Sequence, residues 1–431
     1  MKTGEVIQKI KNGEYDGSFT RLYGACRVES QRKRYIKLIQ SFESLYGDQD
    51  VYLFSVPGRS EISGNHTDHN HGKVIAAALD IDIIAVASPL NEPVIKIKSA
   101  GYRESITDLN ALDPGKVKKG CSSALVAGVA DYFEKNGYAT GGFCACTTSD
   151  VIMGSGISSS AAFEVMAGNI LNFLYNNGVV SPVELAKAGK YAENEFFGKP
   201  CGLMDQLACA VGGFCYMDFA EPTHPYVEKL TFDISKYGYC LCLVNTGGSH
   251  AKLTDEYASL PKEMKDIASY YSKPVLRTVN KADFMADIPE LREKFGDRAV
   301  LRAIHYFDEN DRVEIQRKAI KENDIDTFFE NVTKSGNSSF KYLQNVFCTK
   351  SPEEQGLSLA LALCDRLNVI SRVHGGGFAG TVQAWVKEER VNEFTETIEG
   401  VFGKGSVLTL NIRQYGAIMF DSENIYQKGK E

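Results

Sequence analysis

The feature that most constrains this chain is a glycine- and serine-rich stretch between an expected strand and an expected helix. Residues 142–148 alternate well enough to predict a strand, and residues 161–175 are strongly helix-forming. Between them lie Gly154 and Gly156, followed by three serines where the helix would begin. Glycines let the backbone approach a ligand closely, serines are good N-caps, and free amides at a helix start bind anions. Two interpretations stay open: a phosphate-binding loop, or a capped helix after a Gly-Ser turn.

A Walker A loop is excluded, because no Gly-Lys-Ser/Thr follows the glycines. The negative charge of a bound phosphate would then have to be balanced by backbone amides, by a metal ion and by cationic side chains from other parts of the chain. The hydroxyls of Ser158, Ser159 and Ser160 suit Mg²⁺, which prefers oxygen ligands. The rest of the chain must supply a carboxylate for the metal, a cation and an acceptor site.

Composition narrows the class of protein. A chain of 431 residues has room for two or three domains, and its net charge of −7 argues against nucleic acid or an anionic membrane as partner. The first residues are too polar for a signal peptide, and no apolar run is long enough to span a bilayer. The 11 cysteines, without a Cys-x-x-Cys pair, are expected to be reduced core residues. These features predict a cytoplasmic protein that acts on small molecules, with no protein partner implied.

A second unusual segment is strongly polar and runs from Pro57 to Gly72. Its prolines and glycines predict a loop between a short strand at 51–56 and two strands at 74–79 and 81–87. Three interpretations stay open here: a substrate-binding loop, a solvated loop without a role, and a metal-dependent hydrolase site. The ligands of such a metal would be His66, Asp68, His69 and His71.

A third segment places an isolated carboxylate among apolar residues. A helix starting at Ser181-Pro182 should carry Glu193 near its end, and Asp205 falls in the first turn of the next helix. Asp205 is either a helix-start carboxylate favoured by the dipole or a buried catalytic acid. A carboxylate in apolar surroundings needs a partner, which favours a site.

The C-terminal part predicts a two-layer α+β domain. The segment 273–334 is charged and helical without a distinctive motif. The elements expected after it are a helix from Ser351-Pro352 to Leu367, strands at 369–373 and 381–386 around a glycine-rich turn, a helix at 388–401, and strands at 407–412 and 417–420.

Four motifs in this order resemble those of the galactokinase family of the GHMP kinases. The family pattern Gly-Arg-Val-Asn-Leu-Ile-Gly-Glu-His-Thr-Asp-Tyr is similar to residues 58–69, and Gly-x-Gly-Leu-Ser-Ser-Ser-Ala to residues 154–161. Cys-Gly-Ile-Met-Asp-Gln is similar to residues 201–206, and Gly-Gly-Gly-Phe-Gly-Gly to residues 375–380. The resemblance spans the chain from about residue 51 onward.

The resemblance implies a two-lobed α+β GHMP kinase fold with the active site in the cleft. Residues 1–238 would form a lobe like domain 2 of ribosomal protein S5, and residues 239–431 a ferredoxin-like lobe. The implied activity is ATP-dependent phosphorylation of the anomeric hydroxyl of a hexose, most simply galactose, with Mg²⁺ as cofactor.

The resemblance also implies roles for individual residues. Asp205 would be the catalytic carboxylate with Arg59 beside it, and Ser160 and Glu193 would hold Mg²⁺. The residues implied to face the sugar are Asn65, His66, Thr67, Asp68 and Tyr257. The residues implied to surround the ATP phosphates are Gly154, Ser155, Gly156, Ile157, Ser158, Ser159 and Ser160.

The first motif departs from the family pattern in ways that bear on the substrate. Asn65 replaces the Glu that in galactokinases meets the 6-position of the sugar, and Ser60-Glu61 replace Val-Asn. His69 and His71 replace the usual Tyr and Gly. A kinase for galacturonate or another hexose derivative is therefore an alternative, since asparagine carries no charge to repel a carboxylate. A non-catalytic sugar sensor is a further alternative, which the intact transfer residues disfavour.

Overall fold

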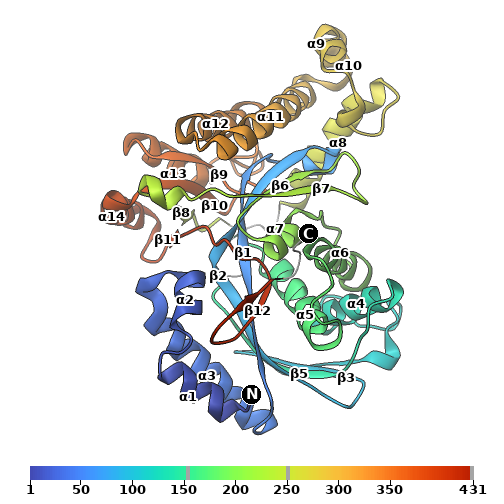
Figure 1. The fold of residues 1–431 in the computed structure, drawn as a ribbon. Coiled ribbons are helices and arrows are strands. Elements are labelled where there is room, and N and C mark those ends of the chain that lie inside the picture. Colours follow the sequence, from blue (N-terminus) through green and yellow to red (C-terminus); the bar gives the residue numbers. More distant parts are fainter. Residues whose placement is uncertain (152–155, 249–252, 428–431) are drawn as a thin grey trace.

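A computed structural model describes residues 1–151, 156–248 and 253–427, and these contain two β-sheets (Figure 1). The larger sheet has the strand order β13-β12-β1-β2-β5-β3-β4, with β6 paired to β2 and β7 to β6. Neighbouring strands are antiparallel except β3 and β5, which are parallel. Its strands are β1 (Tyr52–Ser63), β2 (Lys73–Pro89), β3 (Val94–Ser99), β4 (Ser105–Asp108), β5 (Phe143–Ser149), β6 (Phe214–Asp218), β7 (Tyr226–Leu230), β12 (Ile418–Phe420) and β13 (Ile425–Tyr426).

Strands β1 and β2 are longer than the sequence predicts. The expected loop from Pro57 to Gly72 begins only at Gly64, because β1 continues to Ser63. The pairing of β1 with β2 shifts register between Pro57 and Arg59 and again between Glu61 and Ser63. Such irregularities re-aim side chains without ending the strand. The two expected strands at 74–79 and 81–87 are one strand, β2, buried over nearly its whole length.

Helices cover both faces of this sheet (Figure 1). Alternate residues of a strand point to opposite faces, and Ile84 and Val86 pack with the N-terminal helices while Ile83 and Ala85 face the other side. One face carries α1 (Thr3–Lys11), α2 (Asp16–Tyr23) and α3 (Val28–Tyr46). The other face carries α4 (Ser122–Lys135), α5 (Ser159–Tyr175), α6 (Pro182–Tyr191) and α7 (Met204–Val211).

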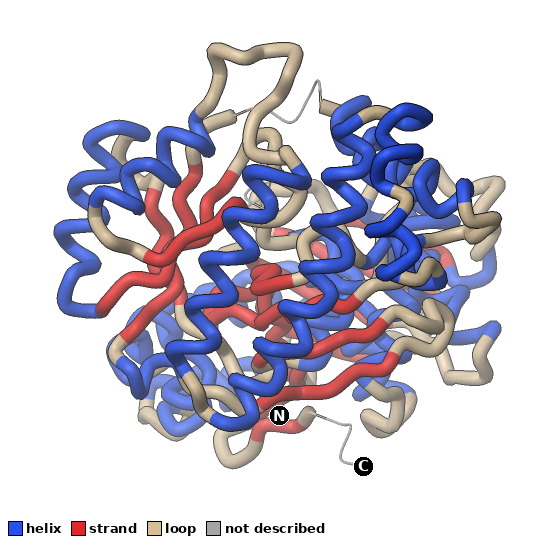
Figure 2. Tube along the Cα trace, turned by 90° about the horizontal axis from the view of Figure 1, so that it is seen from above, coloured by secondary structure: helices blue, strands red, loops and turns tan. Residues whose placement is uncertain are grey.

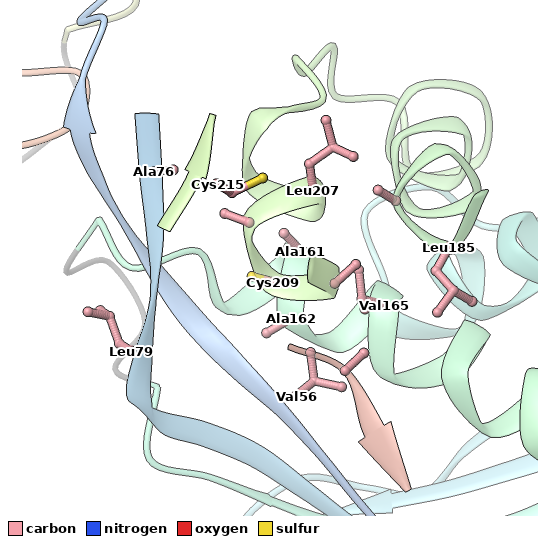
Figure 3. Packing of buried hydrophobic residues seen from close by; sticks show 14 of the residues in the cluster. Val56, Ala76, Leu79, Ala161, Ala162, Val165, Leu185, Leu207, Cys209 and Cys215 are labelled. Carbon is pink, nitrogen blue, oxygen red and sulfur yellow. The ribbon is translucent and has the colours of Figure 1, made fainter. Parts of the chain in front are cut away.

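The packing of α5 places its N-terminus at the end of the glycine-serine stretch. Ala161, Ala162 and Val165 of α5 lie in one buried cluster with Val56 of β1 and Leu207 of α7 (Figure 3). Small residues on α5 let the helix approach both neighbours closely. The start of α5 and the start of α7 are thereby brought together.

The smaller sheet lies in the C-terminal half and has the order β11-β8-β10-β9 (Figure 1). Its strands are β8 (Tyr239–Asn245), β9 (Ile370–Val373), β10 (Thr381–Lys387) and β11 (Val407–Leu410). The helices of this half are α8 (Thr254–Tyr270), α9 (Lys281–Ala286), α10 (Ile288–Phe295), α11 (Asp297–Glu322), α12 (Ile325–Ser338), α13 (Gly356–Arg366) and α14 (Val391–Phe402). Seen from above, helices lie over the strands (Figure 2).

Two expectations for this half are corrected. Helix α13 begins at Gly356 and not at Ser351-Pro352. The strand expected at 417–420 does not join the smaller sheet, because it is β12, which pairs with β1 through Leu53 and Phe420. The division into residues 1–238 and 239–431 stays a prediction. The end of the chain, with β12 and β13, belongs to the larger sheet, whose other strands come from residues 1–238.

Two further findings concern membrane-spanning helices and cysteines. No helix among the described residues is both long and apolar enough to cross a membrane. All eleven cysteines are free, and eight of them are buried, as expected for reduced core residues.

Candidate active site

A buried ion pair joins the first and third motifs of the resemblance. Arg59 on β1 donates from Nε and Nη2 to the two carboxylate oxygens of Asp205, at 2.7 and 2.6 Å. Asp205 lies in the first turn of α7, as the sequence predicts. Ser158 also donates to Asp205, and Arg59 Nη1 donates to the carbonyl of Gly156. The ion pair therefore contacts Gly156 and Ser158, which are the first and last described residues of the phosphate-loop motif before α5.

The ion pair fixes the protonation state of Asp205. Burial raises the pKa of Asp205, but the adjacent Arg59 guanidinium and the Ser158 hydroxyl lower it by more, so the net shift is downward. The side chain of Asp205 is 32% exposed, against 8% for Arg59. Asp205 is thus an ionised carboxylate that a ligand can reach, held by an arginine that is buried.

The glycine-serine stretch lies directly against β1. Arg59 N donates to the carbonyl of Ile157 at 3.2 Å, and a Cβ on Gly58 would come within 3.1 Å of that oxygen. Ser158 has a positive φ of 57° and precedes the first residue of α5, Ser159. Ser160 follows in the first turn of the helix. Gly154 and Ser155, which the resemblance assigns to phosphate binding, lie outside the described residues.

Four side chains form what we term the metal-side cluster: Glu164, Glu193, Lys199 and Gln206. Glu193 lies in a π-helical turn that extends α6, Ala192–Phe197. Its Oε1 accepts from Lys199 Nζ at 2.9 Å, and its Oε2 accepts from Gln206 Nε2 at 3.3 Å. The same Gln206 amide donates to Glu164 Oε2 at 3.1 Å. Gln206 therefore bridges two buried carboxylates.

The metal-side cluster suits a cation. Glu164 Oε1 and Gln206 Oε1 are buried and have no hydrogen-bond partner in the described structure. Burial and the neighbouring Glu193 raise the pKa of Glu164 to about 8. Lys199 alone therefore does not offset two ionised carboxylates in this buried cluster, and a bound cation would take the place of the Glu164 proton. Glu193 together with the Ser160 hydroxyl offers the hard oxygen ligands that Mg²⁺ prefers.

The loop between β1 and β2, residues 64–72, is termed the sugar-side loop. His66 lies with its Nε2 3.0 Å from the carbonyl of Gly376, and the hydroxyl of Tyr257 donates to the carbonyl of Gly377 at 2.8 Å. Asp68 lies against Gly202, where a Cβ would come within 2.7 Å of Asp68 Oδ2. The first, third and fourth motifs therefore meet at this loop.

Two residues expected to face the sugar are turned into the protein instead. The Asn65 side chain is fully buried, and its Nδ2 donates to Glu61 Oε1 at 2.9 Å and to the carbonyl of Gly375 at 2.7 Å. Its Oδ1 accepts from Asn345 Nδ2 at 2.9 Å. The Thr67 hydroxyl donates to the carbonyls of Gly64, the first loop residue, and Lys73, the first residue of β2. Both side chains shape the loop rather than line its open surface.

The departure at Asn65 is part of an exchanged pair. The family pattern has asparagine where Glu61 stands and glutamate where Asn65 stands, so the two residue types have traded places. The carboxylate of Glu61 also pairs with the buried Arg372, at 2.8 Å. Burial raises the pKa of Asp68 in the neighbouring loop, and the Glu61 charge adds to this rise. The carboxylate is thus retained near the loop from a different position.

Sequence reasoning expected a helical segment at 273–334 but missed that one of its helices, α11, holds the sugar-side loop. Glu309 of α11 accepts from Gly64 N at 3.0 Å, His305 Nε2 lies 2.9 Å from the carbonyl of Asn65, and Tyr306 donates to the carbonyl of Asn70 at 3.0 Å. The available sequence signal was the spacing of His305 and Glu309, because residues four apart lie on the same face of a helix. Their partners are some 240 residues away in the chain, so only the fold reveals the contact.

The hydrolase interpretation lacks a ligand set. Among residues 1–151, 156–248 and 253–427, no group of three or more His, Cys, Asp or Glu side chains is placed to hold a metal ion. His66 contacts the glycine turn, and His69 Nδ1 is the partner of Asn70 Nδ2 at 2.9 Å. Burial lowers the pKa of His69 well below its ordinary value.

The fold and this site define a GHMP kinase. Residues 124–213 match the model of the GHMP kinases N terminal domain, and residues 40–89 match the galactokinase galactose-binding signature. The chain is 30% identical over 376 residues to a galactokinase of Glaesserella parasuis serovar 5 (strain SH0165), covering 84% of this chain and 92% of the relative. A galactokinase of Bacillus subtilis (strain 168) is 29% identical over 371 residues, covering 83% and 90%. The chain belongs to the galactokinase family.

Solved structures agree on the fold. A Lactococcus lactis galactokinase complexed with galactose superposes with a TM-score of 0.74 at 23% identity, covering 88% of this chain and 97% of that one. A Methanococcus jannaschii mevalonate kinase superposes with a TM-score of 0.59 at 15% identity, covering 84% and 98%. The GHMP kinase fold expected from the sequence is therefore confirmed.

Proposed function

We propose that this protein transfers the γ-phosphoryl group of ATP to the anomeric hydroxyl of galactose. The observation that carries the proposal is the Asp205–Arg59 pair, which joins the start of α7 to the glycine-serine stretch before α5. It places an ionised carboxylate beside the expected phosphate site, in a member of the galactokinase family.

The chemistry assigned to the pair follows from its geometry. Phosphoryl transfer needs positioning and charge stabilisation more than covalent chemistry from the protein. Asp205 accepts or orients the proton of the anomeric hydroxyl, and Arg59 keeps that carboxylate ionised and fixed. Three of the Arg59 nitrogens are already engaged with Asp205 and Gly156, so its role is to hold the carboxylate in place.

We assign Mg²⁺ to Ser160 and Glu193. Magnesium bound there would neutralise phosphate charge. On the protein side, Gln206 fixes the orientation of Glu193, and the described residues of the phosphate loop, Gly156 to Ser160, present backbone amides at the start of α5. These groups position the nucleotide against Asp205.

On the sugar side, the proposal assigns hydroxyl contacts to His66, Asp68 and Tyr257. Removing sugar hydroxyls from water is costly unless polar groups match them. Asn65 and Thr67 contribute by holding the loop in shape. Asp68 already brings a carboxylate to the proposed sugar contacts, which favours a neutral hexose over galacturonate, since a second negative charge in a desolvated site is unfavourable. We also propose a cytoplasmic location, which the free cysteines support.

A substrate panel tests the proposal. The native protein is assayed with galactose, glucose, talose and galacturonate, with ATP or GTP as donor, and the product is identified by ³¹P NMR. We expect galactose to give the highest kcat/KM and a 1-phosphate product. A preference for galacturonate, or binding of galactose and ATP without turnover, would contradict the proposal and support the uronate kinase or the sensor, respectively.

A further inference from the structure

The proposed reaction leaves the nucleotide phosphates without an assigned protein cation. In a Walker A loop a lysine of the motif meets the β- and γ-phosphates, but none stands in the glycine-serine stretch here. Arg59 is buried and committed to Asp205 and Gly156. Charge on the transferred group must be stabilised in the transition state, so a further cation is expected near Asp205.

Lys199 is placed for that role. Its backbone is fixed, because the amides of Gly198 and Lys199 both donate to the carbonyl of Glu193 at 3.0 Å. Its side chain is 63% exposed and reaches over the buried Glu193, with Nζ 2.9 Å from Oε1. The charge of Lys199 contributes to lowering the pKa of Asp205 as well. The ammonium thus lies near both the expected metal ligand and the catalytic carboxylate.

We propose that Lys199 is the phosphate-binding cation of this kinase, pairing with Glu193 in the ligand-free protein and donating to a phosphate oxygen when nucleotide is bound. The inference rests on the proposed function. A lysine suits such an exchange, since its ammonium is a compact charge on a flexible stem with three donors.

A purely structural role for Lys199 makes the opposite prediction. If the lysine only neutralised Glu193, it would compete with a metal ion for the same carboxylate. Its removal would then leave the affinity for magnesium-nucleotide unchanged or increased. If it binds phosphate, its removal weakens that affinity. The sign of the change therefore separates the two roles.

The test measures nucleotide binding by calorimetry on the wild type, Lys199→Met and Lys199→Arg. Lys187→Met is the matched control, because Lys187 pairs with Glu184 at a similar 2.8 Å. With excess Mg²⁺, we expect Lys199→Met to bind a non-hydrolysable ATP analogue about 10- to 100-fold more weakly, the size expected for a lost charged hydrogen bond. The loss should be smaller for ADP, because Lys199 lies on the Asp205 side. Lys199→Arg should recover most of the affinity and Lys187→Met should bind like the wild type.

Equal or tighter binding of the analogue by Lys199→Met would overturn the proposal. Thermal unfolding verifies that each variant is folded. Should Lys199→Met fail to fold, Lys199→Gln replaces it, because glutamine still donates to Glu193 but carries no charge. The wild-type substrate panel judges the proposed function separately, since nucleotide affinity is measured without sugar. A protein that binds nucleotide through Lys199 but does not phosphorylate galactose would refute the function and leave this inference standing.

Discussion

The sugar-side loop and the metal-side cluster differ in how completely their buried polar groups are hydrogen-bonded by the rest of the protein. The sugar-side loop is bound from outside by α11, with Gly64, Asn65 and Asn70 each contacting a side chain of that helix through the backbone. The metal-side cluster leaves one oxygen of Glu164 and one of Gln206 buried without a partner in the described structure. The sugar-side loop has its own exception in His69 Nε2, which is likewise unpaired.

This difference indicates which side of the site is already formed before a ligand binds. A loop held by buried hydrogen bonds is preorganised, so little ordering remains when a sugar binds. A cluster with two carboxylates and a single lysine is complete only when a cation joins it. Variants on the first side should therefore act through stability and sugar affinity, and those on the second side through metal and nucleotide.

The largest effect is expected where the two sides meet, at Asp205. Asp205→Asn keeps the shape but removes the proton acceptor, so kcat should fall by about 10²- to 10⁴-fold. Galactose affinity, measured by calorimetry without nucleotide, should stay within about tenfold, because Asn retains a hydrogen-bonding oxygen. Near-normal turnover of this variant would move the catalytic role to another residue.

The next largest effect is expected in the sugar-side loop, at the exchanged pair Glu61 and Asn65. In Asn65→Glu one carboxylate oxygen would keep the Asn345 Nδ2 donor, but the oxygen that replaces Nδ2 would face Glu61 and the Gly375 carbonyl, which are both acceptors, in a site that is fully buried. An unpaired buried charge costs about 3–5 kcal/mol. We expect denaturant unfolding to show a loss of this size, together with a raised KM for galactose.

The double variant Glu61→Asn/Asn65→Glu sharpens this test. It restores the family arrangement, so the two substitutions should be less harmful together than the sum of the single variants. Strict additivity of the unfolding free energies would show that positions 61 and 65 do not act as a pair.

The contrast between the two sides also explains how much could be read from the sequence. The glycine-serine stretch, the helix start at Asp205 and the family motifs are local patterns, and they predicted the fold and the contact between Arg59 and Asp205. The continuation of β1 through Arg59 was missed, because Pro57 and Gly58 predict a loop while two irregularities in the pairing accommodate them. The orientation of Asn65 and the contacts of His305 and Glu309 depend on partners distant in sequence. No local pattern reports such contacts.

A smaller effect is expected on the metal side. Glu193→Gln removes the charge that would hold Mg²⁺, so the Mg²⁺ concentration for half-maximal activity should rise by about 10- to 100-fold. Calorimetry with galactose alone should show unchanged affinity, because Glu193 does not contact the sugar-side loop among the described contacts. Unchanged Mg²⁺ dependence would refute the assignment of Glu193 as a metal ligand.

The smallest effect, and one of opposite sign, is expected at Glu164. Burial and Glu193 raise the pKa of Glu164 to about 8 from an ordinary 4.5, so the folded protein retains a proton that the unfolded chain releases between these values. Stability due to this group therefore falls as pH rises from 4.5 to 8. Glu164→Gln mimics the protonated form and does not titrate, so its stability advantage over the wild type should be about 2 kcal/mol larger at pH 8 than at pH 6. Denaturant unfolding of both proteins in EDTA at pH 6 and pH 8 measures this advantage. A stability difference between the two proteins that is the same at pH 6 and pH 8 would show that the metal-side cluster tolerates both charges without a cation, and the contrast between the two sides would lose its basis.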